Sequence, residues 1–189
     1  MKKSGGAGQV RVTAGSAGGL WLKVPRDFNS RPTQNRVKQA IFSSLGERVP
    51  GAKVLDLYAG TGSLGLEALS RGAESAVFVE KNRLHATLIQ ENLVYCKLLG
   101  QVVNRSVESH LEQKTPACFN LILADPPYIK GVHNLSNDPV IIALRRFIHP
   151  DGLLVWEHDS LNRWEVNPHW KLLKTASYGE SSVSYLLPL

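Results

Sequence analysis

The stretch VLDLYAGTGSLG, residues 54–65, joins a strand-like apolar run to a loop with glycines at positions 60, 62 and 65. Glycines at this spacing between a strand and a helix are typical of loops by which α/β proteins hold a nucleotide-like ligand. The stretch therefore predicts a strand, a loop and a helix, with the ligand at the carboxyl end of the strand. The alternative is a plain strand-to-helix turn without a ligand.

Asp56 indicates which ligand the loop binds. It lies at the end of the strand, where a dinucleotide would place its pyrophosphate, and a carboxylate would repel that group. S-adenosyl-L-methionine (AdoMet) carries an ammonium group and a sulfonium instead, which a carboxylate favours directly or through water. Asp56 therefore favours AdoMet over NAD.

A second acid, Glu80, ends the next apolar run, residues 76–79, at the distance from the loop where a carboxylate accepts both ribose hydroxyls. NAD and AdoMet sites share this feature, so Glu80 supports the fold more than the choice of cofactor. The alternative for Glu80 is a solvated strand end.

The motif DPPY, residues 125–128, follows the apolar run FNLILA, residues 119–124, which reads as a buried parallel strand. An exocyclic amine is a poor nucleophile, because its lone pair is delocalised into the ring. The Asp125 carboxylate and the Pro126 carbonyl are predicted to accept its two N–H groups and to aim the lone pair at the methyl group. Tyr128 would stack on an unpaired or flipped base. A Pro-Pro pair that merely ends a strand is the alternative.

Together, the loop and the motif predict methyl transfer from AdoMet to nitrogen. Neither a metal nor a covalent nucleophile is required, because the sulfonium is already an activated leaving group. The prolines fix the backbone and keep the carbonyl aimed. The predicted catalytic residues are Asp125, Pro126, Pro127 and Tyr128.

Further motifs resemble one family. They are RPT (31–33), RVK (36–38), IF (41–42) and LEALSRGA (66–73), beside the loop and DPPY. This pattern resembles the RsmD family of bacterial 16S ribosomal RNA guanine-N2 methyltransferases, from about Gln9 to the C-terminus. The resemblance implies AdoMet as cofactor, 16S rRNA or the assembling small ribosomal subunit as partner, and a cytoplasmic location. The residues alone imply only an amine.

The chain departs from the family pattern at three places, one of which is the turn at residues 14–20, where a basic residue common in the family is missing. Asn35 stands where the family usually has Asp, and Ser106 stands where it tends to place an acid or amide against adenine. Ser106 is expected to bond adenine more weakly, with the Val107 backbone N–H reading the ring nitrogen. The predicted cofactor contacts are Asp56, Tyr58, Ala59, Gly60, Gly62, Glu80, Lys81, Ser106, Val107 and Asp125.

Positive charge is concentrated at the N-terminus. Residues 1–48 hold nine basic and two acidic side chains, a net +7, whereas the whole chain is +6. This segment is therefore the candidate RNA-binding arm, read as a hairpin (9–14 and 20–24) and a helix (34–49). The predicted RNA contacts are Arg11, Arg31, Thr33, Arg36 and Lys38. Arg31, Arg36 and Lys38 would bind phosphate or close over the cofactor; a solvated helix face is the alternative.

The predicted fold class is α/β, a Rossmann-like AdoMet-dependent methyltransferase fold with a mostly parallel seven-stranded sheet. Residues 1–49 form an extension and residues 50–189 the methyltransferase domain. A C-terminal hairpin is expected to place an antiparallel strand at the sheet edge. The predicted strands span residues 53–57, 75–80, 101–104, 119–124, 153–157, 170–177 and 183–187.

Other features exclude several classes of protein. The six histidines have no metal-ligand spacing, so no metal is predicted, and the two cysteines read as reduced core residues. No apolar segment suggests secretion or membrane spanning. A monomer is expected. Trp156 and Glu157 read as core and strand-end residues more than as pocket lining.

Three functions stay open at this level: a guanine-N2 methyltransferase, an enzyme acting on adenine N6 or a glutamine amide, and an rRNA-binding assembly factor.

Overall fold

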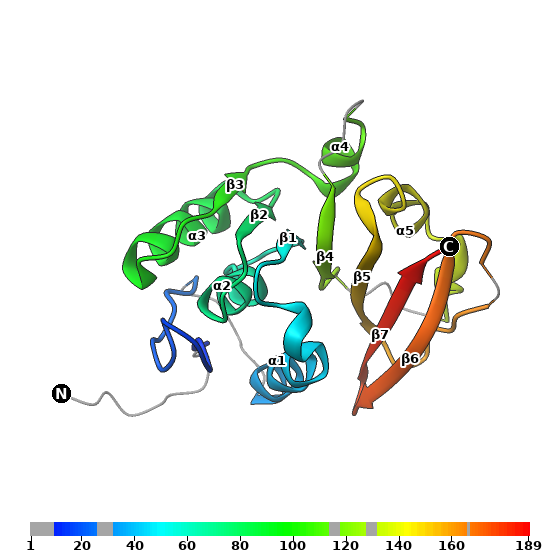
Figure 1. Cartoon of the computed structure of the whole chain (residues 1–189), viewed down its shortest axis with the longest axis horizontal. Helices are drawn as coiled ribbons and strands as arrows, with labels where there is room; N and C mark the ends of the chain where they lie inside the picture. Colours follow the sequence, from blue (N-terminus) through cyan, green and yellow to red (C-terminus); the bar gives the residue numbers. More distant parts are fainter. Residues whose placement is uncertain (1–9, 26–31, 114–117, 128–131, 166) are drawn as a thin grey trace.

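The structure, a computed structural model, describes residues 10–25, 32–113, 118–127, 132–165 and 167–189. One seven-stranded sheet crosses the molecule in the order β3-β2-β1-β4-β5-β7-β6 (Figure 1). The strands are β1 Lys53–Leu57, β2 Ser75–Val79, β3 Gln101–Val103, β4 Phe119–Ala124, β5 Ile148–Asp159, β6 Trp170–Tyr178 and β7 Ser181–Pro188.

Strands β1 to β5 run parallel, and β7 is antiparallel to both of its neighbours, β5 and β6. The predicted α/β fold class and its C-terminal hairpin are therefore confirmed. Within this hairpin, β7 pairs with β5, and β6 forms the edge of the sheet.

Helices cover both faces of the sheet (Figure 1). The face of α1, α2 and α3 shares one hydrophobic cluster, and the face of α4 and α5 shares a second. Strands β1 and β4 are buried on both faces, which explains their nearly continuous apolar sequences. The helices are α1 Pro32–Leu45, α2 Ser63–Ser70, α3 Arg83–Cys96, α4 Val107–Leu111 and α5 Pro139–Leu144, with short 3₁₀ turns at Gly46–Arg48 and Leu135–Asn137. Within the described ranges, no helix has the length and apolar character needed to cross a membrane.

The N-terminal segment forms the expected hairpin but packs directly on the core of the α/β fold. Val12 N donates to Leu20 O at 2.9 Å, and Leu22 N donates to Val10 O at 2.8 Å. Val10, Val12 and Leu22 belong to the same buried cluster as α1 and α2. The residues of this hairpin are thus part of the core. That residues 1–49 form an RNA-contacting extension stays a prediction, which rests on their positive charge.

A buried acid on α2, Glu67, fixes this segment. Its Oε2 accepts the Thr13 backbone N–H at 2.7 Å, and its Oε1 accepts the Thr13 hydroxyl at 2.6 Å and Arg71 Nε at 2.8 Å. Lys38 of α1 reaches the same carboxylate, with Nζ 3.5 Å from Oε2, and both side chains are at most 3% exposed. One carboxylate therefore joins the hairpin, α1 and α2.

Both ionisable groups of this pair are shifted. Burial alone would raise the pKa of Glu67, but the Thr13 hydrogen bonds and the Lys38 charge outweigh it, so the pKa lies below its usual value. Burial lowers the pKa of Lys38, and the Glu67 charge opposes that shift. The folded protein therefore holds Glu67 ionised, and the stability that this carboxylate contributes is lost as the pH falls through its depressed pKa.

Replacement of Glu67 by alanine is expected to lower the free energy of unfolding by about 3–5 kcal/mol, because it leaves the buried Lys38 ammonium without its charge partner. Urea denaturation measures this change. The matched control is Glu91→Ala, which removes the exposed pair with Lys23 and should cost less than about 1 kcal/mol. Equal unfolding midpoints for the two variants would contradict the role given to Glu67.

Candidate active site

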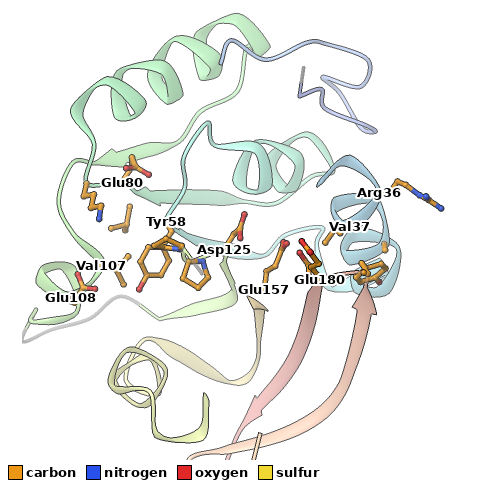
Figure 2. A pocket seen from close by; sticks show the side chains of 17 residues that line it. Arg36, Val37, Tyr58, Glu80, Val107, Glu108, Asp125, Glu157 and Glu180 are labelled. Atoms are coloured by element: carbon orange, nitrogen blue, oxygen red, sulfur yellow. The ribbon is translucent and has the colours of Figure 1, made fainter. Parts of the chain in front are cut away.

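A cavity of about 1150 Å³ lies where the parallel strands end. β1, β2, β4 and β5 each contribute residues at or just beyond their carboxyl ends, which is where open α/β sheets bind ligands. Its volume is ample for a nucleoside-sized cofactor together with a base. Figure 2 shows the lining side chains, with Glu80 at one end, Asp125 in the middle and Glu180 toward the other end.

Asp56 lies beneath the glycine loop and is only 1% exposed. Its Oδ2 accepts the Gly65 backbone N–H at 2.8 Å, so it anchors the first turn of α2. Burial raises the pKa of Asp56 well above its usual value, and the Gly65 hydrogen bond opposes that shift. Asp56 also lines a hollow of about 110 Å³ beside Gly60 and Asp125. It is therefore close to the predicted cofactor position but is first of all a support for the loop.

The glycine loop is shaped by backbone geometry that favours glycine. Gly60 and Gly62 have φ of 55° and 76°, in the left-handed region. Gly65 is helical, but a Cβ there would lie 2.3 Å from the Phe78 ring. Tyr58 precedes the loop, lines the cavity and meets Trp156 edge to face at a centroid distance of 6.3 Å. Ala59 lines the smaller hollow.

Glu80 stands at the carboxyl end of β2, where the sequence predicted it. Its Oε2 accepts the Gly60 backbone N–H at 2.8 Å, and its Oε1 accepts the Asn82 backbone N–H at 2.7 Å. Each carboxylate oxygen accepts up to two hydrogen bonds, so capacity for ribose hydroxyls remains. Asn104 donates to the carbonyls of Glu80 and Lys81 and so fixes this turn beside the cavity.

Ser106, which the sequence predicts as an adenine contact, lies outside the lining of the cavity. The Ser106 hydroxyl accepts the Ser109 backbone N–H at 3.2 Å as the N-cap of α4, and Ser106 is not among the cavity-lining residues. Val107 does line the cavity, and its N–H belongs to the first helical turn, which has no acceptor within the helix. Sequence reasoning missed Glu108, which also lines the cavity and offers a carboxylate to an adenine amine.

The DPPY motif is the predicted clamp for the target amine. Its first three residues, Asp125, Pro126 and Pro127, line the cavity. Tyr128 lies outside the described residues. Asp125 keeps an exposed face toward the cavity, but protein surrounds it on its other sides. That burial, together with the negative charge of Glu157, raises the pKa of Asp125 to about 7.

Helix α1 and the turn between β6 and β7 form the end of the cavity opposite Glu80. Arg36, Val37 and Ala40 contribute from α1, and Tyr178–Ser181 from the turn. Sequence reasoning missed this turn, because nothing in its composition places it near DPPY. Glu157 also lines the cavity, while Trp156 is core as expected.

The predicted RNA contacts differ in how far their side chains are exposed to solvent. Lys38 is a correction: its Nζ donates to Arg11 O at 2.7 Å and Ser63 Oγ at 2.9 Å, so it is buried and cannot reach RNA phosphate. It lines the small hollow instead. Arg11 and Arg36 are exposed. Arg31 and the Thr33 side chain lie outside the described part of the chain.

Residues 10–187 match the family model described as Conserved hypothetical protein 95. The chain belongs to this family. The predicted resemblance to RsmD is confirmed by relatives named Ribosomal RNA small subunit methyltransferase D. The Escherichia coli K12 relative is 40% identical over 136 residues, covering 70% of this chain and 68% of its own. The Haemophilus influenzae relative is 32% identical over 185 residues, covering 95% and 93%.

A solved structure agrees with this family assignment. The Escherichia coli candidate methyltransferase yhhF superposes with a TM-score of 0.83 at 30% identity, covering 96% of this chain and 98% of its own. In the described part of the chain, no three His, Cys, Asp or Glu side chains gather as metal ligands.

Gly65→Ala is expected to lower the free energy of unfolding by about 1–3 kcal/mol and to weaken AdoMet binding, because the new methyl group displaces Phe78 and the loop. Thermal unfolding and calorimetric titration with AdoMet measure the two effects. The control is Gly51→Ala, where φ is 73° but no atom lies within 4 Å of the new Cβ. It should change stability only; wild-type AdoMet affinity in Gly65→Ala would contradict this account.

Proposed function

We propose that this protein transfers a methyl group from AdoMet to the exocyclic N2 amine of a guanine in 16S rRNA of the small ribosomal subunit. The observation that carries the proposal is that Asp125 and Pro126 line the same cavity as Tyr58 and Glu80, while Asp125 also lines the small hollow beside Gly60. Cofactor and amine would therefore meet at the carboxyl end of β4. The names of the RsmD relatives support ribosomal RNA as the substrate.

The cofactor contacts divide along the cavity. Glu80 would accept the ribose hydroxyls, Val107 and Glu108 would meet the adenine, and Gly60 with Asp56 would lie along the methionine part. The cavity residues offer carboxylates and backbone N–H groups, which suit a ligand carrying hydroxyls and cations. When bound, AdoMet supplies a methyl group on a good leaving group.

The chain's own residues position the amine and take its proton. The Asp125 carboxylate and the Pro126 carbonyl each accept one N–H of the target, which directs the nitrogen lone pair toward the methyl group. As the N–C bond forms and the S–C bond breaks, one amine proton leaves to Asp125 or water. Asp125 must be ionised for both tasks. As the sequence predicts, Tyr128 would stack on the target base.

The N-terminal part of the chain supports an RNA substrate. Arg36 lies at the rim of the cavity on α1, and Arg11 is exposed on the hairpin, where it stacks over Trp21 at 5.8 Å. Arg31 and Thr33 complete the proposed contacts. We infer a cytoplasmic monomer that needs no metal.

The test is transfer of labelled methyl from AdoMet to small-subunit particles that lack the modification, beside naked 16S RNA, DNA and protein. Label in N2-methylguanosine is the expected result. Label in N6-methyladenine or in protein would keep the clamp chemistry and overturn the substrate, and no label in any sample would favour an RNA-binding assembly factor.

Asp125→Ala is expected to lower the rate of methyl transfer by about 100-fold or more, the size of effect seen when one preorganised polar group is removed. The matched control is Asp151→Ala, because the Asp151 side chain is 94% exposed and Asp151 does not line the cavity. A near-normal rate for Asp125→Ala would rule out the amine clamp.

The single-turnover rate is expected to rise with pH through about 7, because the raised pKa of Asp125 leaves its carboxyl protonated at lower pH. The measurement is the rate between pH 5.5 and 8.5, roughly one and a half units either side of that value. A flat profile for the wild type would contradict the requirement for an ionised Asp125.

A further inference from the structure

Glu157 and Asp125 are neighbours across two parallel strands. The register of β4 and β5 pairs Ala124 with Trp156, so the next residue of each strand is an acid, and strands lie about 4.8 Å apart. Trp156 points into the core on the α4 and α5 side, whereas Glu157 faces the cavity. Figure 2 shows Asp125 and Glu157 projecting side by side between Tyr58 and Glu180.

Glu157 lies beside Asp125 between the two ends of the cavity, and both acids also line the small hollow near Gly60. The cofactor end of the cavity is lined by Val79, Glu80 and Val107, and the opposite end by α1 and the turn between β6 and β7. With the cofactor at the first end, we place the target base in the space that Glu157, Arg36 and the turn border. A carboxylate at that place meets the edge of the base next to its reacting amine.

The two purines that carry an exocyclic amine differ at that edge. In guanine, the ring nitrogen N1 beside the N2 amine carries a hydrogen, so these two adjacent positions are both donors. In adenine, ring atom N1 beside the N6 amine is an acceptor. A carboxylate accepts hydrogen bonds and cannot donate one when ionised. Two adjacent carboxylates therefore match guanine and repel the lone pair of adenine.

We propose that Glu157 accepts the N1–H of the target base and so selects guanine over adenine. This inference rests on the proposed function and adds the residue that distinguishes guanine from adenine. Asp125 and Pro126 hold the amine, and Glu157 holds the neighbouring ring position. The raised pKa of Asp125 supports this arrangement, because it reflects the charge of Glu157 acting on the same small space.

The experiment uses full-length protein and small-subunit RNA. The guanine that becomes labelled is first mapped, and 2-aminopurine then replaces it in RNA reassembled into particles. This base keeps the N2 amine but presents an acceptor at N1. Wild-type protein is expected to methylate guanine about 10- to 100-fold faster than 2-aminopurine, the range for one hydrogen bond to a charged group. Equal rates would overturn the proposal without any variant.

The variant Glu157→Gln distinguishes recognition of the N1 position from the other differences between guanine and 2-aminopurine. The amide can turn either its oxygen or its NH₂ toward the ring, so the ratio of the guanine rate to the 2-aminopurine rate should fall to within about threefold. The matched control is Glu108→Gln, which removes one negative charge from the cofactor end of the same cavity. Its ratio should equal that of the wild type.

An unchanged ratio in Glu157→Gln would overturn the proposal, provided that the variant still binds AdoMet in calorimetry. If that variant does not fold, the wild-type ratio alone decides. Failure of the proposed function gives a different result, because no N2-methylguanosine then forms with wild-type protein and no position can be mapped.

Discussion

The loop between β1 and α2 is held in place through its backbone N–H groups by two buried carboxylates. Glu80 accepts the Gly60 N–H from the neighbouring strand, and Asp56 accepts the Gly65 N–H from below. Both acids are at most 7% exposed, so neither bond competes much with water. The loop lines the small hollow beside the cavity, and residues at the ends of β4 and β5 line both the hollow and the cavity.

The sequence predicted β1 and β4 well because their apolar runs are buried on both faces. Runs at 53–57 and 119–124 match β1 and β4 to the residue. β5 was predicted too short, since it begins at Ile148 and passes through Pro150 and Gly152, residues that normally interrupt a strand. β7 was predicted as part of a hairpin, but no local pattern reveals which member of a hairpin pairs with β5.

Site residues were predictable where one motif supplies both the chemistry and the position. Glu80 and Asp125 follow directly from their strands. Lys38 was misjudged as an RNA contact, because its partner Glu67 is 29 positions away and local sequence cannot show a buried ion pair. The same limit applies to Ser106, whose hydroxyl caps the helix that begins beside it. It also applies to Glu108 and to the turn at residues 178–181, because only the folded chain brings them to the cavity.

The place of β7 between β5 and β6 has a consequence for synthesis of the protein. The strand that joins the edge of the sheet to its centre is the last one made, and the turn before it encloses the cavity. A nascent chain that has already produced the loop, the clamp and Glu157 still lacks that wall. That end of the cavity is thus completed only when β7 has left the ribosome and inserted between two strands made earlier.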